Sequence, residues 1–133
     1  MHHKVDPHGE LTLRTIAMPA DTNSTGDIFG GWVMAQMDLA EGIVGVERAT
    51  GQVITVAVDG MHFIQPVKVG DVLCVDTSVE RAGGASITSA VAAWAHRFRT
   101  RTREKVTSAA FTFVAVDDAG NACSVTAPAT ATA

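Results

Sequence analysis

The chain has 133 residues without a break in composition, which is the length of one domain and enough to bury about two thirds of its unfolded surface. Hydrophobic residues make up 47% and charged residues 18%, with a mean hydropathy of +0.19, so we expect a homo-oligomer that covers some apolar surface. The net charge of −4 excludes a general attraction to nucleic acid or to anionic membranes.

The two cysteines, Cys74 and Cys123, lack the spacing of a metal site and are too few for a disulfide scaffold. No apolar run approaches the ~18 residues of a membrane span. We therefore expect a cytoplasmic protein that binds neither a metal nor a membrane. We expect a flexible tail over residues 1–10, a single domain over 11–122 and a disordered Ala/Thr-rich tail over 123–133.

The predicted elements begin with a strand from Leu11 to Met18, which is apolar and Thr-rich and is ended by Pro19. A polar loop over residues 21–31 precedes an apolar helix that should start near Gly30 or Gly31 and end before Gly51. From Gln52 onward, β-branched and alternating patterns predict strands at 53–58, 61–64, 72–81, 86–98 and 105–116.

The order is one strand, one helix and then strands joined by short turns, with no helical crossovers. This order predicts an α+β fold in which successive strands pair antiparallel. Phe111 and Phe113 share one face of the last strand with Ala109 and Ala115. We expect this face to pack on the helix. Such packing would give a single sheet curled around one buried helix.

Asp38 is the first candidate for chemistry because it lies in a helix that is apolar nearly all round and should be largely buried. On a helix, Met34, Glu41, Gly42 and Gly45 share its side, and the two glycines would leave room for a ligand or another chain. The alternative is a structural aspartate that accepts backbone hydrogen bonds and holds a loop.

Gly30 and Gly31 would expose backbone N–H groups at the positive end of the helix dipole, which can serve as an oxyanion hole. Asn23, in the preceding turn, could position a water or a substrate carbonyl. Backbone requirements at a helix start explain the glycines equally well, and a turn or capping role explains Asn23.

The remaining motifs are less specific. The chain has no nucleophile elbow, Walker loop, GxGxxG or HExxH motif, so phosphoryl transfer, dinucleotide binding and zinc proteolysis have no support. His62 and His96 lie in strand-like segments without a recognisable partner. A cation recurs at every second residue of one basic hairpin, which could grip phosphates or could keep an edge strand solvated: Arg97, Arg99, Arg101, Arg103 and Lys105.

Three ordered blocks, which together cover roughly residues 11–122, resemble the bacterial hotdog-fold acyl-CoA thioesterases of the YciA-like group. The first is DTNSTGDIFGGWVMAQMD, the second is VITVAVDGMHFIQPVKVGDVL and the third is AFTFVAVDDAGNA. The resemblance implies a hotdog fold in which subunits join their sheets edge to edge, with dimers assembling into a hexamer. It also implies an acyl-CoA substrate bound between subunits, a role in fatty acid metabolism, and no cofactor beyond the coenzyme A of the substrate or product.

By position, the resemblance implies that Asp38 is the catalytic carboxylate, acting as general base on water or as nucleophile. Asn23 would complete the site from the neighbouring subunit, and the Gly31 N–H, beside Gly30, would polarise the carbonyl. Thr55 falls on a family Thr near the thioester. The turn from Gly83 to Ser86 matches the segment that contacts CoA.

The sequence departs from the family pattern at three places. The family often has Arg where this chain has Gly84, so a phosphate contact is either missing or supplied by Arg81 or the basic hairpin. His62 stands where the family usually has Asn, and an Ala/Thr tail replaces the expected C-terminal helix. The leading hypothesis is therefore hydrolysis of an acyl-CoA. The rivals are a hydratase or dehydratase that would use His62, and a non-catalytic acyl-CoA-binding module.

Overall fold

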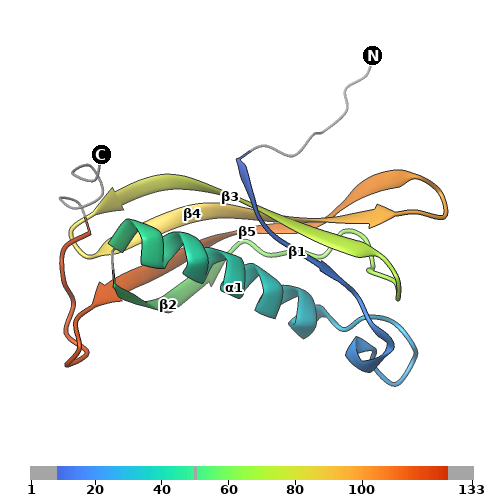
Figure 1. The fold of residues 1–133 in the computed structure, drawn as a ribbon, viewed down its shortest axis with the longest axis horizontal. Coiled ribbons are helices and arrows are strands. Elements are labelled where there is room, and N and C mark those ends of the chain that lie inside the picture. The colour runs from blue at the N-terminus through green and yellow to red at the C-terminus, as the bar shows by residue number, and fades with distance from the viewer. Residues whose placement is uncertain (1–8, 50, 126–133) are drawn as a thin grey trace, which may run out of the picture.

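The computed structural model describes residues 9–49 and 51–125 and shows one sheet wrapped along one helix (Figure 1). The α+β prediction is confirmed. Chain order gives β1 (Glu10–Ile16), the short 3-10 helix η1 (Pro19–Asp21), α1 (Gly30–Ala49), β2 (Gln52–Asp59), β3 (Val72–Gly83), β4 (Ser86–Arg97) and β5 (Thr102–Val116). The helix starts and ends where the glycine-flanked pattern predicts.

The strand order in the sheet is β1-β3-β4-β5-β2, and every pair is antiparallel. The prediction that successive strands pair is correct for β3 with β4 and for β4 with β5. It is wrong for β2 and β3, because β2 pairs with β5 and forms an edge of the sheet. The strand predicted at 61–64 is also wrong: this segment belongs to the long connection to β3, where Ile64 N donates to Val106 O at 2.7 Å.

One side of α1 packs on the inner face of the sheet. Its buried side chains recur at helical spacing, and the predicted aromatic face of β5 meets them, with Phe111 at 1% and Phe113 at 0% exposure. A Cβ added at Gly45 would lie 2.7 Å from the Phe113 ring, closer than real Cβ contacts. The helix therefore approaches the sheet this closely only because residue 45 has no side chain.

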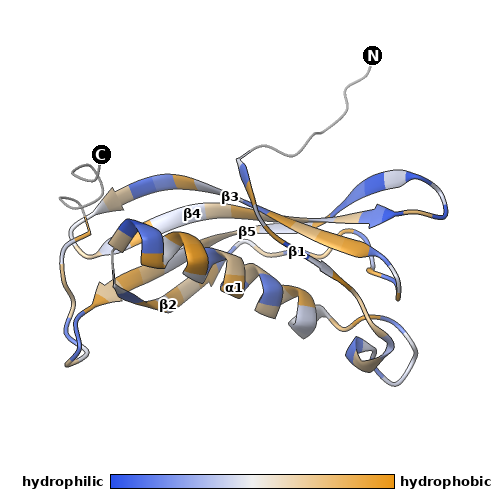
Figure 2. Cartoon of the chain, in the orientation of Figure 1, coloured by the Kyte–Doolittle hydropathy of each residue, from blue (hydrophilic) through white to orange (hydrophobic). Residues whose placement is uncertain are grey.

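The other side of α1 is open in the protomer, so the prediction of a largely buried helix is wrong for a single chain. Leu39, Ile43 and Val46 are 58%, 47% and 50% exposed, and Figure 2 shows hydrophobic residues along the central turns of α1. On the edge strand β2, Ile54 and Val56 are also half exposed. An apolar helix face beside an unpaired strand edge is the kind of surface that another subunit covers.

The packed chain extends past residue 122. Val125 is 1% exposed, belongs to a core cluster with Phe113 and Ala115, and its N donates to Gly84 O at 2.9 Å. Most of both predicted tails, residues 1–8 and 126–133, lies outside the described residues. Within the described ranges, the structure contains no helix that is both long enough and apolar enough to cross a membrane.

Candidate active site

Asp38 lies on the open side of α1, where its carboxylate is tied to the neighbouring strand. The Thr55 hydroxyl of β2 donates to Asp38 Oδ1 at 2.6 Å. The prediction that Asp38 is buried is wrong for the protomer, since this residue is exposed. The hydrogen bond occupies one carboxylate oxygen and fixes the side chain, so Oδ2 is the oxygen available for chemistry.

Asp38 and Thr55 stand at one end of an open groove between α1 and β2 with a volume of about 730 Å³. Gly42 lines it, and a Cβ added there would meet nothing within 4 Å, so this glycine leaves open space as predicted. Gly45 does not, because it is packed against Phe113. The other lining residues are mainly apolar: Leu39, Ile43, Val46, Glu47 and Val53.

The fully buried acid of α1 is Glu41 rather than Asp38. Glu41 is 0% exposed, and the nearest polar group acting on its carboxylate is the Ser89 hydroxyl of β4, which is itself fully buried. Burial raises its pKa from 4.5 to about 7, the Ser89 hydroxyl acts in the opposite direction, and the charge of Asp38 raises it further. Glu41 is buried and does not line the groove, so Asp38 is the acid of α1 that is placed to act there.

Asn23 is held in a tight turn by its own amide oxygen. Oδ1 accepts hydrogen bonds from Thr25 N at 3.0 Å, Thr25 Oγ1 at 2.7 Å and Asp27 N at 3.1 Å. Lys68 forms an ion pair of 2.9 Å with Asp27 and so links this turn to the connection that precedes β3. Because Oδ1 is used within the turn, the Asn23 amide nitrogen is the group left to donate outward.

The start of α1 presents Gly30 and Gly31 as predicted. Trp32 N donates to Phe29 O at 3.1 Å, whereas the Gly31 N–H has no partner among the described residues. Gly31 is exposed, and a Cβ there would make only ordinary contact with the Phe29 ring, at 3.4 Å. A Cβ at Gly30 would be tighter, 3.2 Å from the Phe63 ring. The helix start can therefore donate an N–H to an external carbonyl oxygen.

These predicted residues do not meet within one protomer. Thr55 and Asp38 are in contact, but neither Asn23, Gly30 nor Gly31 lines the groove. Gly31 lies seven residues before Asp38, about 10 Å along the helix axis. One protomer therefore does not bring these groups together in the groove.

The predicted CoA-binding turn and the basic hairpin lie at opposite ends of strand β4. Gly83, Gly84 and Ser86 form the exposed turn between β3 and β4, with Arg81 exposed near the end of β3. The basic hairpin connects β4 to β5, and β4 separates the two ends by roughly 35–40 Å. A single protomer does not bring the two groups together (Figure 1).

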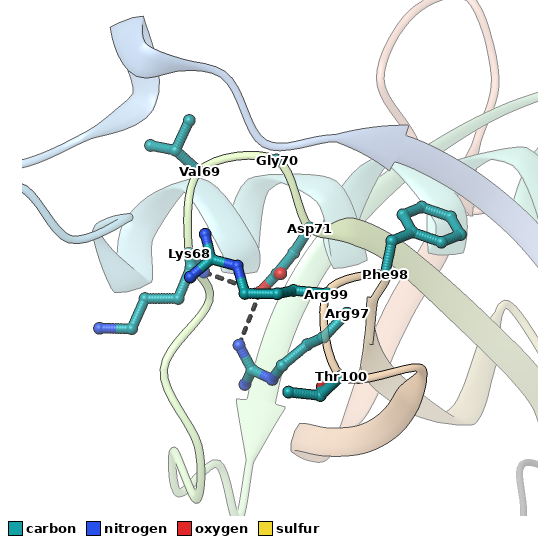
Figure 3. A pocket seen from close by; sticks show the side chains of 8 residues that line it. All are labelled: Lys68, Val69, Gly70, Asp71, Arg97, Phe98, Arg99 and Thr100. Atoms are coloured by element: carbon teal, nitrogen blue, oxygen red, sulfur yellow. Dashed lines mark hydrogen bonds and ion pairs between the residues drawn. The ribbon is translucent and has the colours of Figure 1, made fainter.

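Arg97 of the basic hairpin has a structural role. It donates to Asp71 Oδ2 at 2.7 Å, to Glu104 at 3.3 Å and to Pro66 O at 2.6 Å. Figure 3 shows Arg97 and the Lys68 backbone converging on Asp71 in a pocket of about 290 Å³. Arg97 therefore holds the turn before β3 instead of offering a free charge to a phosphate.

The two candidate histidines lie away from the groove. His62 is exposed in the connection after β2, and its carbonyl oxygen accepts a hydrogen bond from Thr107. His96 is on β4 and lines a separate hollow with Arg14 and Arg103, where burial and then these two arginines lower its pKa. Neither histidine forms a pair with Asp38 in the protomer.

The apolar lining of the groove was not among the residues singled out from the sequence. Leu39, Ile43 and Val46 follow Asp38 at positions i+1, i+5 and i+8, so they form a stripe with spacings of four and three residues. That spacing was visible in the sequence. The stripe could not be distinguished from the rest of the helix, because the whole helix is apolar and its sequence does not indicate which side faces the sheet.

Comparison with known proteins matches residues 25–100 to the family model of the Thioesterase superfamily. The chain is 49% identical over 117 residues to the acyl-CoA thioester hydrolase YciA of Salmonella typhimurium, covering 86% of this chain and 88% of that protein. It is 51% identical to a hexameric thioesterase from Yersinia pestis, with a TM-score of 0.86 over 90% of this chain and 97% of that one.

A further solved structure is HI0827, a hexameric broad-specificity acyl-coenzyme A thioesterase in the form of an aspartate-to-alanine mutant. It is 45% identical, with a TM-score of 0.87 over 91% of this chain and 89% of that chain. These similarities extend over nearly all of the sheet and the helix, so they include the groove and the turns on either side of it.

Proposed function

Because the chain belongs to the thioesterase superfamily and is an acyl-CoA thioesterase, we propose that it hydrolyses acyl-CoA at the Asp38 groove, releasing CoA and a carboxylic acid. The observation that carries this proposal is the Thr55 to Asp38 hydrogen bond at the mouth of an apolar groove. It presents one oriented carboxylate beside a surface suited to a hydrocarbon chain.

Asp38 acts as the general base. Its Oδ2 takes a proton from a water molecule while the water oxygen bonds to the thioester carbon and the carbonyl electrons move onto oxygen. Collapse of this tetrahedral intermediate re-forms the C=O and breaks the C–S bond. The thiolate leaves and takes up the proton from Asp38, which restores the carboxylate.

The charge that develops on the carbonyl oxygen needs donors, and the Gly31 N–H supplies one at the positive end of the α1 dipole. The Asn23 amide nitrogen supplies a second donor to the carbonyl oxygen or to the attacking water. Both groups are already held in place, Gly31 by the helix start and Asn23 by its turn. Fixed donors of this kind stabilise the transition state without reorganising.

The complete site forms between two subunits, with Asp38 from one and the Asn23 and Gly31 groups from the other. Two features of the protomer support this arrangement: these groups are apart in one chain, and the open edge of β2 lies beside the exposed apolar face of α1. We propose pairing of two sheets through β2 and assembly of the dimers into a hexamer, as in the hexameric relatives.

For the CoA end of the substrate, the Gly83 to Ser86 turn and Arg81 are the proposed contacts. The exposed turn offers backbone groups without bulky side chains, and Arg81 offers a cation. A hydratase or dehydratase would use a histidine paired with the acid, and no pair between His62 and Asp38 forms within the protomer. A pure binding module would have no use for a carboxylate oriented by Thr55.

The experiment is thiol release from a panel of acyl-CoA thioesters. Asp38→Ala and Asp38→Asn should each lose roughly a hundredfold or more of kcat, since both remove the base. Asp38→Asn keeps the shape of the side chain and controls for packing. Wild-type activity in either variant would refute the mechanism, and hydration of an enoyl-CoA that depends on His62 would favour the hydratase.

The shared site has its own test. Asp38→Ala and Asn23→Ala proteins should each have little activity alone. Mixed dimers should regain up to about half of the wild-type activity, since one of their two sites carries neither substitution. Co-expression with two affinity tags isolates the mixed dimers. If these dimers are as inactive as their parents, each site lies within one subunit.

A further inference from the structure

The basic hairpin between β4 and β5 ends in a turn that the proposed active site does not use. This hairpin tip consists of residues 98–101, and Figure 1 shows the hairpin, coloured orange, at one end of the sheet. Its residues do not line the Asp38 groove, and they lie neither on β2 nor on α1, through which the subunits are proposed to pair. The hairpin tip is therefore a separate surface of the protomer.

The hairpin tip exposes an aromatic side chain near a second apolar residue. Phe98 is 68% exposed, more than any other large apolar side chain in the described residues. Val69, in the turn before β3, is 46% exposed, and both residues line the hollow of about 290 Å³ drawn in Figure 3. Apolar residues that are exposed singly are common on protein surfaces. The significance of this pair depends on the charges beside it.

The arginines of the hairpin tip carry charge that no acid of the hairpin compensates. Asp71 and Glu104 both pair with Arg97, at 2.7 and 3.3 Å. Arg99 and Arg101 are exposed and form no ion pair within the part of the chain that the structure describes. Both acids therefore have their partner within the protein, and the two arginines remain available to an external anion.

Arg101 occupies a backbone conformation that arginine rarely adopts. Its φ is +56°, and it is the only residue other than glycine with a positive φ in residues 9–49 and 51–125. Glycine or asparagine is the usual residue at such a position of a turn, because its backbone tolerates the left-handed region. The turn therefore carries a cation where local structure alone favours an uncharged residue.

Two cations and an aromatic side chain on one short turn fit the surface of an anionic bilayer. Lipid headgroups offer phosphates to the arginines, and the acyl region just beneath them offers an apolar environment to Phe98. A stable protein partner needs an interface of roughly 1,000 Å² or more, which a turn of this length does not supply. Duplex nucleic acid also offers phosphates, but its bases are stacked and leave no apolar layer for Phe98.

We propose that the hairpin tip docks the protein on an anionic lipid surface, with Phe98 inserted among the headgroups and Arg99 and Arg101 on lipid phosphates. Val69 lies against the same surface. This inference goes beyond the proposed function and does not depend on it. The expectation that the chain binds no membrane came from its net charge and from the lack of a spanning segment, and neither of these describes one local turn.

The test is co-sedimentation of the full chain with vesicles of phosphatidylcholine, either alone or with about 30% phosphatidylglycerol. At about 0.1 M salt, wild type should bind the anionic vesicles at least roughly tenfold more tightly than the neutral ones. Raising the salt to about 1 M shortens the Debye length from about 10 Å to about 3 Å and should remove most of this difference.

Substitutions in the hairpin tip separate its two contributions. Arg99→Gln should weaken binding to the anionic vesicles about fivefold, and adding Arg101→Gln should bring the loss to about 25-fold, since each cation contributes about equally near such a surface. Phe98→Ser should weaken binding at least roughly tenfold, because it removes the inserted apolar group. Phe98→Leu keeps an apolar side chain and should keep most of the binding.

The matched control for Arg99→Gln is Arg81→Gln, which removes an exposed cation at the opposite end of β4. It should change binding to the anionic vesicles by less than about twofold, because Arg81 lies more than a Debye length from the hairpin tip. Two further measurements show that the tip variants are folded. Their thiol release from butyryl-CoA without vesicles and their assembly mass by light scattering should both equal those of wild type.

Four results would overturn the inference: equal binding to neutral and anionic vesicles; wild-type binding by the Phe98→Ser or the double arginine variant; tighter binding to duplex DNA than to the anionic vesicles, unchanged in Phe98→Ser; and a loss of assembly mass in Phe98→Ser, which would show that another subunit covers the hairpin tip. Failure of wild type to release thiol from any acyl-CoA would overturn the proposed function and leave the vesicle result as it stands.

Discussion

The Thr55 hydroxyl donates a 2.6 Å hydrogen bond to Asp38 Oδ1 and so joins the carboxylate proposed as the general base, on α1, to the edge strand β2. Hydrogen bonds to a charged group contribute about 1.5–3 kcal/mol. The contact fixes the direction in which the second carboxylate oxygen points. It also makes the base sensitive to the position of the strand through which the subunits are proposed to pair.

Thr55→Val should lower kcat roughly tenfold with little change in KM, because it removes the hydroxyl, keeps the branched shape and leaves Asp38 free to rotate. Thr55→Ser restores a hydroxyl at the same position and should recover most of the loss. The measurement is steady-state thiol release with octanoyl-CoA. A Thr55→Val enzyme with the wild-type kcat would show that Asp38 does not need this contact.

Glu41 should make the fold less stable as pH rises. Its folded pKa of about 7 lies above the ordinary glutamate value of 4.5, so between these two values the unfolded chain loses the proton while the folded protein keeps it. Stability therefore falls across this window, by on the order of 3 kcal/mol in total. The penalty is absent below the window and complete above it.

Glu41→Gln removes this ionisation. The difference in the free energy of unfolding between this variant and wild type should therefore shift in favour of the variant when the pH is raised from 5 to 8.5. Chemical unfolding at the two pH values measures the gain. The matched control is Glu47→Gln on the exposed side of the same helix. An equal difference between Glu41→Gln and wild type at both pH values would mean that Glu41 is ionised in the folded protein.

The ion pair between Arg97 and Asp71 should be important for stability and not for catalysis. The two side chains are 14% and 10% exposed, and removing one partner of such a buried pair leaves an uncompensated charge, at a cost of roughly 3 kcal/mol. Arg97→Ala should therefore lower the free energy of unfolding by about that amount.

Arg99→Ala is the matched control for Arg97→Ala. Arg99 is exposed, has no ion pair among the described residues, and should change stability by less than about 0.5 kcal/mol. Denaturant unfolding of both variants gives the comparison. Equal stability of the two variants would refute the structural role of Arg97.

The two glycines in the second half of α1 should respond to alanine in opposite directions. Gly42→Ala should raise the free energy of unfolding by up to about 1 kcal/mol, since alanine favours the helix and the space is open. Gly45→Ala should lower it by about 1–3 kcal/mol, since the new methyl would force the Phe113 ring to move. Stabilisation by both substitutions would contradict the tight approach of α1 to the sheet.

Local patterns in the sequence were sufficient for the elements and for their class. The bounds of α1 followed from the glycines that flank it, and the inward face of β5 followed from the alternation of Phe111 and Phe113, because both signals depend on the conformation of neighbouring residues. Asp38 was identifiable for a similar reason, as an acid surrounded by apolar and small residues on one helix.

The pairing of the strands could not be derived from these local patterns. Nothing near β2 indicates that it pairs with β5, more than fifty residues later, instead of with β3. For the same reason the contact between Thr55 and Asp38 was not predictable from spacing. The basic hairpin and the Gly83 turn were candidates for one phosphate site until β4 placed them at its opposite ends.

Residue periodicity sets local structure, and it was enough to predict strands that form a sheet and one apolar helix with an acid at residue 38. Which acid of that helix is buried depended on how the helix packs. A helix that is apolar nearly all round gives no signal for the face that meets the sheet, and packing against Phe113 selected the face with Gly45 and Glu41. Asp38 was thereby left on the open side, beside Thr55 and the groove.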